Sequence, residues 1–242
     1  MRLLWRKGKD EFIVSEPLTR TIPPYAILSH TWGSEEVTFQ DIVGLTGKNK
    51  AGYKKLRFMA DQAAKDHLNF FWVDTCCIDK SSSAEHTEAI NSMFRYYQQA
   101  AKCYIYLADV PTPSSGKSAF RRSRWFTRGW TLQELLAPSS VDFFSADGSQ
   151  LSNKSFMERE ISKVTGIPIK ALQGRPLSKY SVPERMAWAK NRKTTRKEDE
   201  AYCLLGIFGV HMPLIYGEGS NAFIRLREAI VQRSKRNGKS AW

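Results

Sequence analysis

The sequence predicts an α/β fold, in which a mostly parallel sheet is flanked by helices and a helical C-terminal half packs on it. Over residues 1–145, short apolar runs alternate with helical patterns, which is typical of a parallel sheet. The first three runs are apolar on both faces, as strands are when helices cover both sides of a sheet. After Ser145, helical patterns replace the strand pattern.

Four apolar runs are the expected strands, in the order Tyr25–Leu28, Phe70–Val73, Cys103–Leu107 and Val141–Phe144. Between the first two, apolar residues recur at helical spacing at Leu56, Ala60, Ala63 and Ala64. Between the next two, the same spacing occurs at Ala89, Met93, Phe94, Tyr97 and Ala101. Ser82 and Glu85, ahead of this second helix, have the spacing of a capping box. A third helix is expected near Arg124 to Leu136, before the fourth strand.

Helix signals dominate the second part of the chain. Asn153 is expected to cap a helix that ends near residue 165, and residues 195–208 form a second pattern, closed by Gly209. A last amphipathic helix is expected to begin at Ser220. We therefore predict one domain over residues 1–232, with its sheet part at 1–145 and its helical part at 146–232. Residues 111–118 are expected to form a flexible loop, and residues 233–242 a basic frayed tail.

The chain is strongly basic. It has 37 lysine and arginine residues against 24 aspartate and glutamate residues, a formal net charge of +13. A basic excess of this size raises the question of a nucleic acid, an anionic membrane or a polyanionic small molecule as partner. The charge is concentrated in residues 117–128, residues 190–197 and the C-terminal tail. Solvated faces explain most of it, but the first cluster stands directly before Trp130 and Glu134.

Composition and motifs exclude several classes of protein. Four cysteines are too few and too scattered for a disulfide framework, and no Cys/His spacing indicates a metal site, so a reducing, cytoplasmic location is expected. No segment approaches the roughly 20 apolar residues that cross a bilayer. The Walker lysine, GxGxxG, HExxH and GxSxG motifs are absent from the sequence.

Polar and aromatic residues gather where the expected strands end, and ligands bind at that edge in open parallel sheets. The first strand runs into Ser29, His30 and Trp32, the second runs into Asp74, and Glu134 lies on the third helix. Structural roles are the alternative: a turn hydrogen bond for His30 and capping for Asp74. The spacing of Glu134 from the preceding threonine fits a capping box, and spacing alone favours that role.

Two arrangements of nucleophilic side chains are less favoured as catalytic sites. The adjacent thiols of Cys76 and Cys77 suggest redox or acyl-transfer chemistry, but small buried core residues explain them as well. A triad of Ser29, His30 and Asp74 requires a bend, because neighbouring residues on a strand point to opposite faces.

Three sequence blocks resemble the motifs of the fungal heterokaryon incompatibility (HET) domain. They are YAILSHTWG at 25–33, WVDTCCIDK at 72–80 and RGWTLQELLAP at 128–138. The blocks at 184–188, 194–208 and 216–219 resemble the stretch that follows this domain in many family members. The resemblance implies a role in nonself recognition between fungal cells, with the HET domain as effector of regulated cell death. It also implies either a signalling partner that bears a sensor module or a homo-oligomer.

A fainter similarity is to the TIR domain. In TIR enzymes that cleave NAD, the essential glutamate lies in a Trp-Cys-x-x-Glu-Leu sequence, which Trp130 to Leu135 matches except that Thr131 replaces the cysteine. The similarity implies a flavodoxin- or TIR-like sheet, Glu134 as catalytic carboxylate, and NAD as substrate with no cofactor. Substrate-binding roles are implied for Ser29, His30, Trp32, Asp74, Arg124, Arg128 and Trp130. The two arginines would face the phosphates of a dinucleotide.

Three hypotheses of function follow. The first is a cell-death effector with TIR-like hydrolysis of NAD or another nucleotide, which the order of the motifs favours. The second is a non-enzymatic module for homotypic interaction and signalling. The third, nucleic-acid binding, is motivated by charge alone and is the least favoured.

Overall fold

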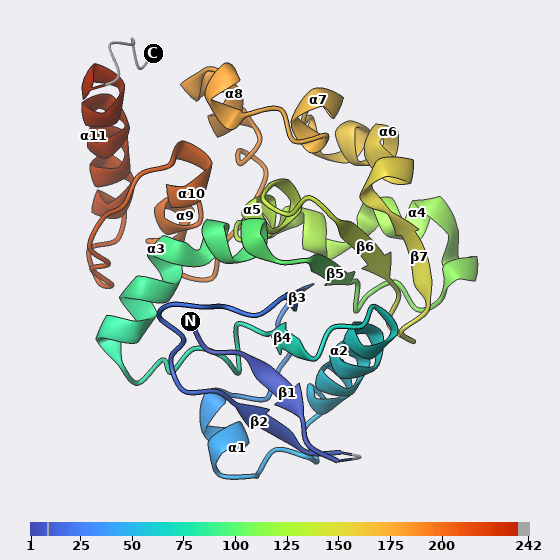
Figure 1. Cartoon of the computed structure of the whole chain (residues 1–242). Coiled ribbons are helices and arrows are strands. Elements are labelled where there is room, and N and C mark those ends of the chain that lie inside the picture. Colours follow the sequence, from blue (N-terminus) through green and yellow to red (C-terminus); the bar gives the residue numbers. More distant parts are fainter. Residues whose placement is uncertain (9, 237–242) are drawn as a thin grey trace.

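A seven-stranded mixed sheet forms the centre of the computed structural model, which describes residues 1–8 and 10–236 (Figure 1). From edge to edge the strands are β2 (Phe12–Val14), β1 (Leu4–Arg6), β4 (Phe70–Trp72), β3 (Tyr25–His30), β5 (Lys102–Tyr106), β6 (Val141–Phe144) and β7 (Gln150–Asn153). The four central strands, β4 to β6, are parallel. The strands outside them pair antiparallel. The mostly parallel α/β fold predicted from the sequence is confirmed.

The order of the parallel strands positions the site. Across the sheet, the parallel strand that comes second in the chain lies first, followed by the strands that come first, third and fourth in the chain. The first four strands of flavodoxin-like sheets have the same order. The chain leaves β3 on one side to make β4 and returns on the other side to make β5. The carboxyl end of β3 therefore lies at the point where the direction of winding changes, and ligands bind at such points in this class of sheet.

Three strands outside the parallel centre of the sheet were not expected from the sequence. β1, β2 and β7 have three, three and four residues, which is too short for an alternating pattern to be distinguished. β1 and β2 nevertheless contribute to the core, because Leu4 and Phe12 are buried. These strands extend the sheet without changing its parallel centre.

Alternate residues of the central strands point to different helices. On β5, the ring of Tyr104 meets Phe58 of helix α2 (Tyr53–Lys65), whereas the thiol of its neighbour Cys103 lies against the Glu134 carbonyl of α5 (Thr131–Leu136). On β4, Trp72 packs on Tyr97 of α3 (Ser83–Gln99). Helix α2 thus covers one face of the sheet, and α3 and α5 cover the other.

Helices fill the second part of the chain, as expected, and Figure 1 shows them beyond α3 and α5. They are α6 (Lys154–Thr165), α7 (Ile169–Leu172), α8 (Val182–Ala187), α9 (Asp199–Tyr202), α10 (Leu205–Phe208) and α11 (Asn221–Arg236), with a 3₁₀ turn η3 (Leu177–Lys179). Asn153 caps α6 as predicted, its side chain accepting from the Phe156 N–H. A short helix, α1 (Phe39–Val43), precedes α2 and was not predicted.

Two predicted helices are each divided into shorter ones. The expected helix near 124–136 consists of the 3₁₀ turn η2 (Arg124–Thr127) and α5, because the Gly129 N–H bonds to the Lys193 carbonyl instead of continuing a helix. The expected helix at 195–208 is α9 followed by α10. Thr195 and Glu198 have the spacing of a capping box but do not form one, because the Glu198 carboxylate accepts the N–H groups of Gly217 and Gly219.

Other local expectations change in detail. Ser82 caps α3, but the Glu85 carboxylate pairs with Arg2 and accepts the Asp79 N–H, so the capping box there is incomplete. Residues 111–118, expected as a loop, include the 3₁₀ turn η1 (Pro113–Ser115) and the start of α4 (Gly116–Arg122). Positions 233–236 of the expected frayed tail belong to α11, and residues 237–242 lie outside the described residues.

Candidate functional site

Ser29 and Glu134 meet at the carboxyl end of β3. Both residues are buried. The Ser29 hydroxyl donates to Glu134 Oε2 and accepts from the Trp125 indole N–H, with 2.7 Å between Trp125 Nε1 and Ser29 Oγ. Trp125 lies on η2, so the short turn before α5 contributes directly to the site. Sequence reasoning missed Trp125, because a fully buried tryptophan before a helix resembles any core residue.

The capping-box interpretation of Glu134 is wrong. Thr131, the expected cap, lies inside α5, and its hydroxyl hydrogen bonds with the carbonyls of Trp125 and Arg128. The Glu134 carboxyl group turns away from the start of the helix and toward β3. Glu134 is therefore a buried carboxyl group at the strand ends rather than a helix cap.

Burial raises the pKa of Glu134 to about 8. The hydrogen bond from Ser29 and the charge of Arg192 oppose this rise, while the negative charge of Asp74 adds to it. The Tyr97 hydroxyl lies beside Glu134 and already donates its hydrogen to the Leu28 carbonyl, 2.8 Å from it. The contact with Tyr97 likewise opposes the rise, and burial outweighs all the effects that oppose it.

Asp74 is the second carboxyl group of the site, and its pKa moves in the opposite direction. It follows β4, and its side chain is 22% exposed. Burial opposes ionisation, but the interaction with His30, the charge of Lys80 and the hydrogen bond from Trp32 together hold the pKa of Asp74 below its ordinary value. Asp74 is therefore an ionised carboxylate next to a neutral one.

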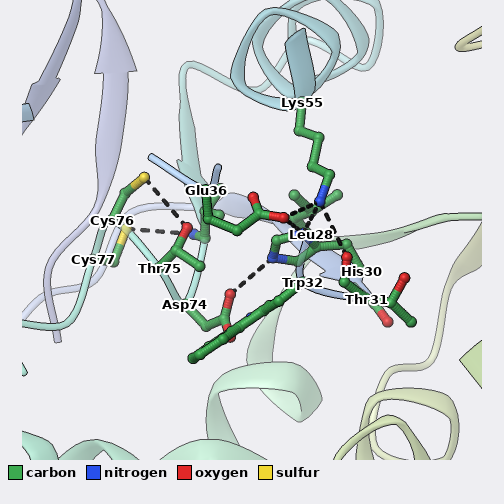
Figure 2. A network of polar contacts seen from close by, with 12 residues as sticks. Leu28, His30, Thr31, Trp32, Glu36, Lys55, Asp74, Thr75, Cys76 and Cys77 are labelled. Carbon is green, nitrogen blue, oxygen red and sulfur yellow. Dashed lines mark hydrogen bonds and ion pairs between the residues drawn. The ribbon is translucent and has the colours of Figure 1, made fainter. Parts of the chain in front are cut away.

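His30 is oriented from both sides (Figure 2). Its Nδ1 lies 2.9 Å from Lys55 Nζ, and its Nε2 lies 3.0 Å from Asp74 Oδ1. Because an ammonium group can only donate, Nδ1 is the acceptor and Nε2 carries the hydrogen that binds Asp74. Lys55 of α2 is itself buried and pairs with Glu36. Ser29 and His30 thus serve opposite faces of the sheet, as strand geometry requires.

Lys55 and Glu36 were missing from the sequence-based site. Lys55 stands on α2 in a run of charged residues, where a solvent-exposed role is the ordinary expectation. Its burial is explained by its contacts, because its ammonium group donates to His30, to Glu36 and to the Thr31 carbonyl. A buried lysine of this kind is recognised only once α2 is placed against β3.

Trp32 forms the exposed side of the site. Its side chain is 54% exposed, and its indole N–H donates to Asp74 Oδ2 at 2.8 Å. The ammonium group of Lys80 lies 3.7 Å from the centre of its ring, within cation–π range. Trp130, another predicted contact residue, is half-buried, and its side chain hydrogen bonds to Asp199.

The predicted phosphate ligands Arg124 and Arg128 are engaged elsewhere. The Arg124 side chain is exposed, with its Nε 3.7 Å from Asp109, and Arg128 donates to the Thr195 hydroxyl at 2.9 Å. The charge of Arg192, from the second basic cluster, acts on Glu134. Its Nη1 donates to the Arg128 carbonyl and the Thr131 hydroxyl, and its buried Nη2 has no hydrogen-bond partner among the described residues.

The adjacent thiols behave as core residues. Cys76 and Cys77 are buried, and burial raises the pKa of Cys76 to about 12 and that of Cys77 well above its ordinary value. The Cys76 thiol donates to the Val37 carbonyl at 3.1 Å. This environment disfavours the thiolate that nucleophilic chemistry needs.

Among residues 1–8 and 10–236, no cluster of three or more His, Cys, Asp or Glu side chains is arranged to hold a metal ion. Within the same ranges, no helix has the length and apolar character needed to span a bilayer.

The chain is similar to one protein family model and to a curated relative. Residues 25–122 match the family model described as heterokaryon incompatibility protein (HET). The chain is 57% identical over 241 residues to the vegetative incompatibility protein HET-E-1 of Podospora anserina, in an alignment that covers 95% of this chain and 18% of that protein. The chain therefore spans about a fifth of this relative's length. No solved structure matches it significantly. The family expected from the sequence blocks is confirmed: this chain carries a heterokaryon incompatibility (HET) domain.

Proposed function

We propose that this chain is an effector domain for vegetative incompatibility that triggers regulated cell death, and that it hydrolyses NAD or another nucleotide at Glu134 and Asp74. One observation carries the enzymatic part. Two carboxyl groups with opposite pKa shifts, Glu134 neutral and Asp74 ionised, stand at the carboxyl ends of neighbouring parallel strands. Pairs of acids whose environments drive their pKa values apart are typical of active sites.

The chemistry fits a substrate with a cationic glycosidic bond. Nicotinamide leaves the ribose of NAD as a neutral molecule, so bond cleavage needs stabilisation of an oxocarbenium-like transition state more than it needs an acid. The ionised Asp74 supplies negative charge for that state. A cationic ligand beside Glu134 also lowers its pKa, so that substrate binding generates a second carboxylate where positive charge develops.

Side chains around the two carboxyl groups suit the rest of a nucleotide. The exposed Trp32 offers an aromatic surface on which a base or nicotinamide ring can stack. The unpaired Nη2 of Arg192 is the donor next to Glu134 for a ligand oxygen. In this proposal Arg192 takes the role that the TIR resemblance implied for Arg124 and Arg128, whose guanidinium groups face Asp109 and Thr195.

The enzymatic proposal is tested by nicotinamide release. The purified domain is incubated with NAD under conditions that induce assembly, and the products are separated chromatographically for wild type, Glu134→Gln and Asp74→Asn. We expect both substitutions to remove release, while Glu228→Gln, which changes an exposed glutamate on α11, leaves it unchanged. Equal release from the wild type and Glu134→Gln, or none from the wild type, refutes the proposal.

A second candidate function is favoured by the enclosure of Glu134, whose exposed fraction is only 8%. If that carboxyl group only holds β3 against α5, the domain acts as a non-enzymatic module that assembles with itself or with a partner bearing a sensor module. Cell killing in a fungal host then persists in a Glu134→Gln variant whose circular dichroism matches the wild type. Nucleic-acid binding, the third hypothesis, predicts an affinity that falls steeply with salt, and absence of binding at low salt refutes it.

A further inference from the structure

A cavity of about 660 Å³ opens among η3, α8, α10 and α11, against α3 and the end of α5. Ser29, Asp74 and Glu134 do not line it. Its volume lies in the range of roughly 300 to 1,000 Å³ that is usual for small-molecule sites. The site proposed above does not use this cavity, so its function needs a separate explanation.

The lining of the cavity is strongly cationic, and the nearby Glu184 carboxylate attracts Arg175 and Arg185 without lining the cavity itself. Its described lining includes Arg175, Lys179, Arg185 and Arg233, and it includes no aspartate or glutamate. None of these four side chains forms an ion pair with a carboxylate of the described residues. Four like charges around one cavity repel one another, and an anion in the cavity would relieve that repulsion.

Two of the guanidinium groups are held close together. Arg185 lies 4.6 Å from the centre of the Phe208 ring and donates to the Ile207 carbonyl at 2.9 Å. Burial and the like charge of Arg233 lower the pKa of Arg185. Arg233 packs on Gly209, where a Cβ atom would come within 2.6 Å of its Nη1. Backbone and ring contacts thus position both groups, and the charge of Glu184, which acts on Arg185, only partly offsets the burial and the repulsion that lower its pKa.

A buried hydroxyl group in the lining lacks a partner. Tyr180 is 8% exposed, and its hydroxyl oxygen is buried with no hydrogen-bond partner among the described residues. The guanidinium group of Arg175 lies 5.6 Å from the centre of its ring. Buried hydroxyl groups without a partner are unfavourable and uncommon, and a ligand oxygen would satisfy this one.

We propose that this cavity binds a small phosphorylated ligand of the nucleoside polyphosphate class. The phosphates would lie between Arg185 and Arg233, because guanidinium groups bind phosphate oxygens through paired hydrogen bonds. The Tyr180 hydroxyl would donate to a further oxygen. Leu136 and Ile207, which also line the cavity, would contact the apolar part of the ligand. A concave site of this volume fits a small molecule better than a nucleic-acid strand.

Titration calorimetry with ATP, inorganic triphosphate and adenosine tests the proposal. The test variant is Lys179→Gln with Arg233→Gln, two exposed side chains for which the structure shows no hydrogen bond. The control is Lys190→Gln with Arg236→Gln, which removes the same charge from exposed positions outside the cavity. We expect ATP and triphosphate to bind, adenosine not to bind, and the test variant to weaken ATP binding by about tenfold or more. The control should change it by less than about twofold.

Two further variants separate this site from the one at Glu134. Tyr180→Phe should weaken ATP binding by a few-fold without unfolding the domain, because it removes only the hydroxyl group. Glu134→Gln should leave ATP binding unchanged, so loss of nicotinamide release and loss of ATP binding are independent results. Absence of ATP binding, equal losses in test and control variants, or tight binding of an oligonucleotide alone overturns the proposal.

Discussion

The protonation of Glu134 predicts a stability that depends on pH in a specific way. Its pKa rises from an ordinary value of 4.5 to about 8 in the folded protein, because burial disfavours the charged carboxylate. A raised pKa means that the folded protein binds the proton more tightly than the unfolded chain does. The stabilising effect is therefore complete below the unfolded pKa and is lost as pH rises toward the folded one.

The magnitude follows from that interval. Each pH unit between the two pKa values is worth about 1.4 kcal/mol, so between about pH 5.5 and about pH 7.5 the loss is about 2.5 kcal/mol. The assay is urea unfolding of the wild type and Glu134→Gln at both pH values. All other titrating groups occur in both proteins, and their effects cancel in the difference between the two free energies of unfolding.

We expect the wild type to lose about 2.5 kcal/mol relative to Glu134→Gln over that interval. Glu228→Gln, on the exposed surface of α11, should follow the wild type. A difference between wild type and Glu134→Gln that stays constant within about 0.5 kcal/mol would mean that Glu134 is ionised in the folded protein. The assignment of a neutral and a charged carboxyl group would then be wrong.

Three other substitutions or reagents test separate parts of the structure. Lys55→Met leaves Glu36 and His30 without their buried cation and should destabilise the protein by about 3 to 5 kcal/mol. Lys54→Met, at an exposed neighbouring position, should be nearly neutral. Thermal unfolding measures the stability of both variants. Gly206→Ala places a Cβ atom 2.1 Å from Phe94 Cβ and should cost about 1 to 3 kcal/mol. Gly33→Ala, whose Cβ atom would lie 3.5 Å from Glu36 Oε1, should cost less, and equal losses of stability would refute the close packing of α10 on α3. All four cysteines are free and buried, so a thiol reagent should modify them only on unfolding, and fast labelling of Cys76 or Cys77 in the native protein would contradict their placement.

The sequence predicted the parallel centre of the sheet because apolar runs of four or five residues are distinct. It did not predict β1 or β2, since three residues carry no periodic signal and these strands are recognised only by pairing with β4 and with each other. The division between η2 and α5 also depends on a distant partner. Gly129 bonds to the Lys193 carbonyl, a contact that spacing within 124–136 cannot indicate.

Only part of the candidate site could be predicted, because several of its residues come together only through the packing of distant elements. Ser29, His30 and Asp74 were found from their places at strand ends, which topology brings together. Lys55, Trp125 and Arg192 come from a helix, a 3₁₀ turn and a loop, so their roles depend on how those elements pack. Glu134 shows the limit of local patterns, because the spacing that resembles a capping box belongs to a residue whose carboxyl group faces the sheet.

The alternation of side chains along β3 explains how two nearby carboxyl groups keep different charges. Ser29 points to the α5 face and donates its neutral hydroxyl group to Glu134, where burial outweighs the charge of Arg192 and favours a protonated acid. His30 points to the α2 face, where Lys55 fixes its hydrogen on Nε2 for Asp74. Asp74 also has Lys80 nearby, so its ionised form is favoured. Because the negative charge of Asp74 in turn raises the pKa of Glu134, any ligand that brings positive charge between them must change both groups together.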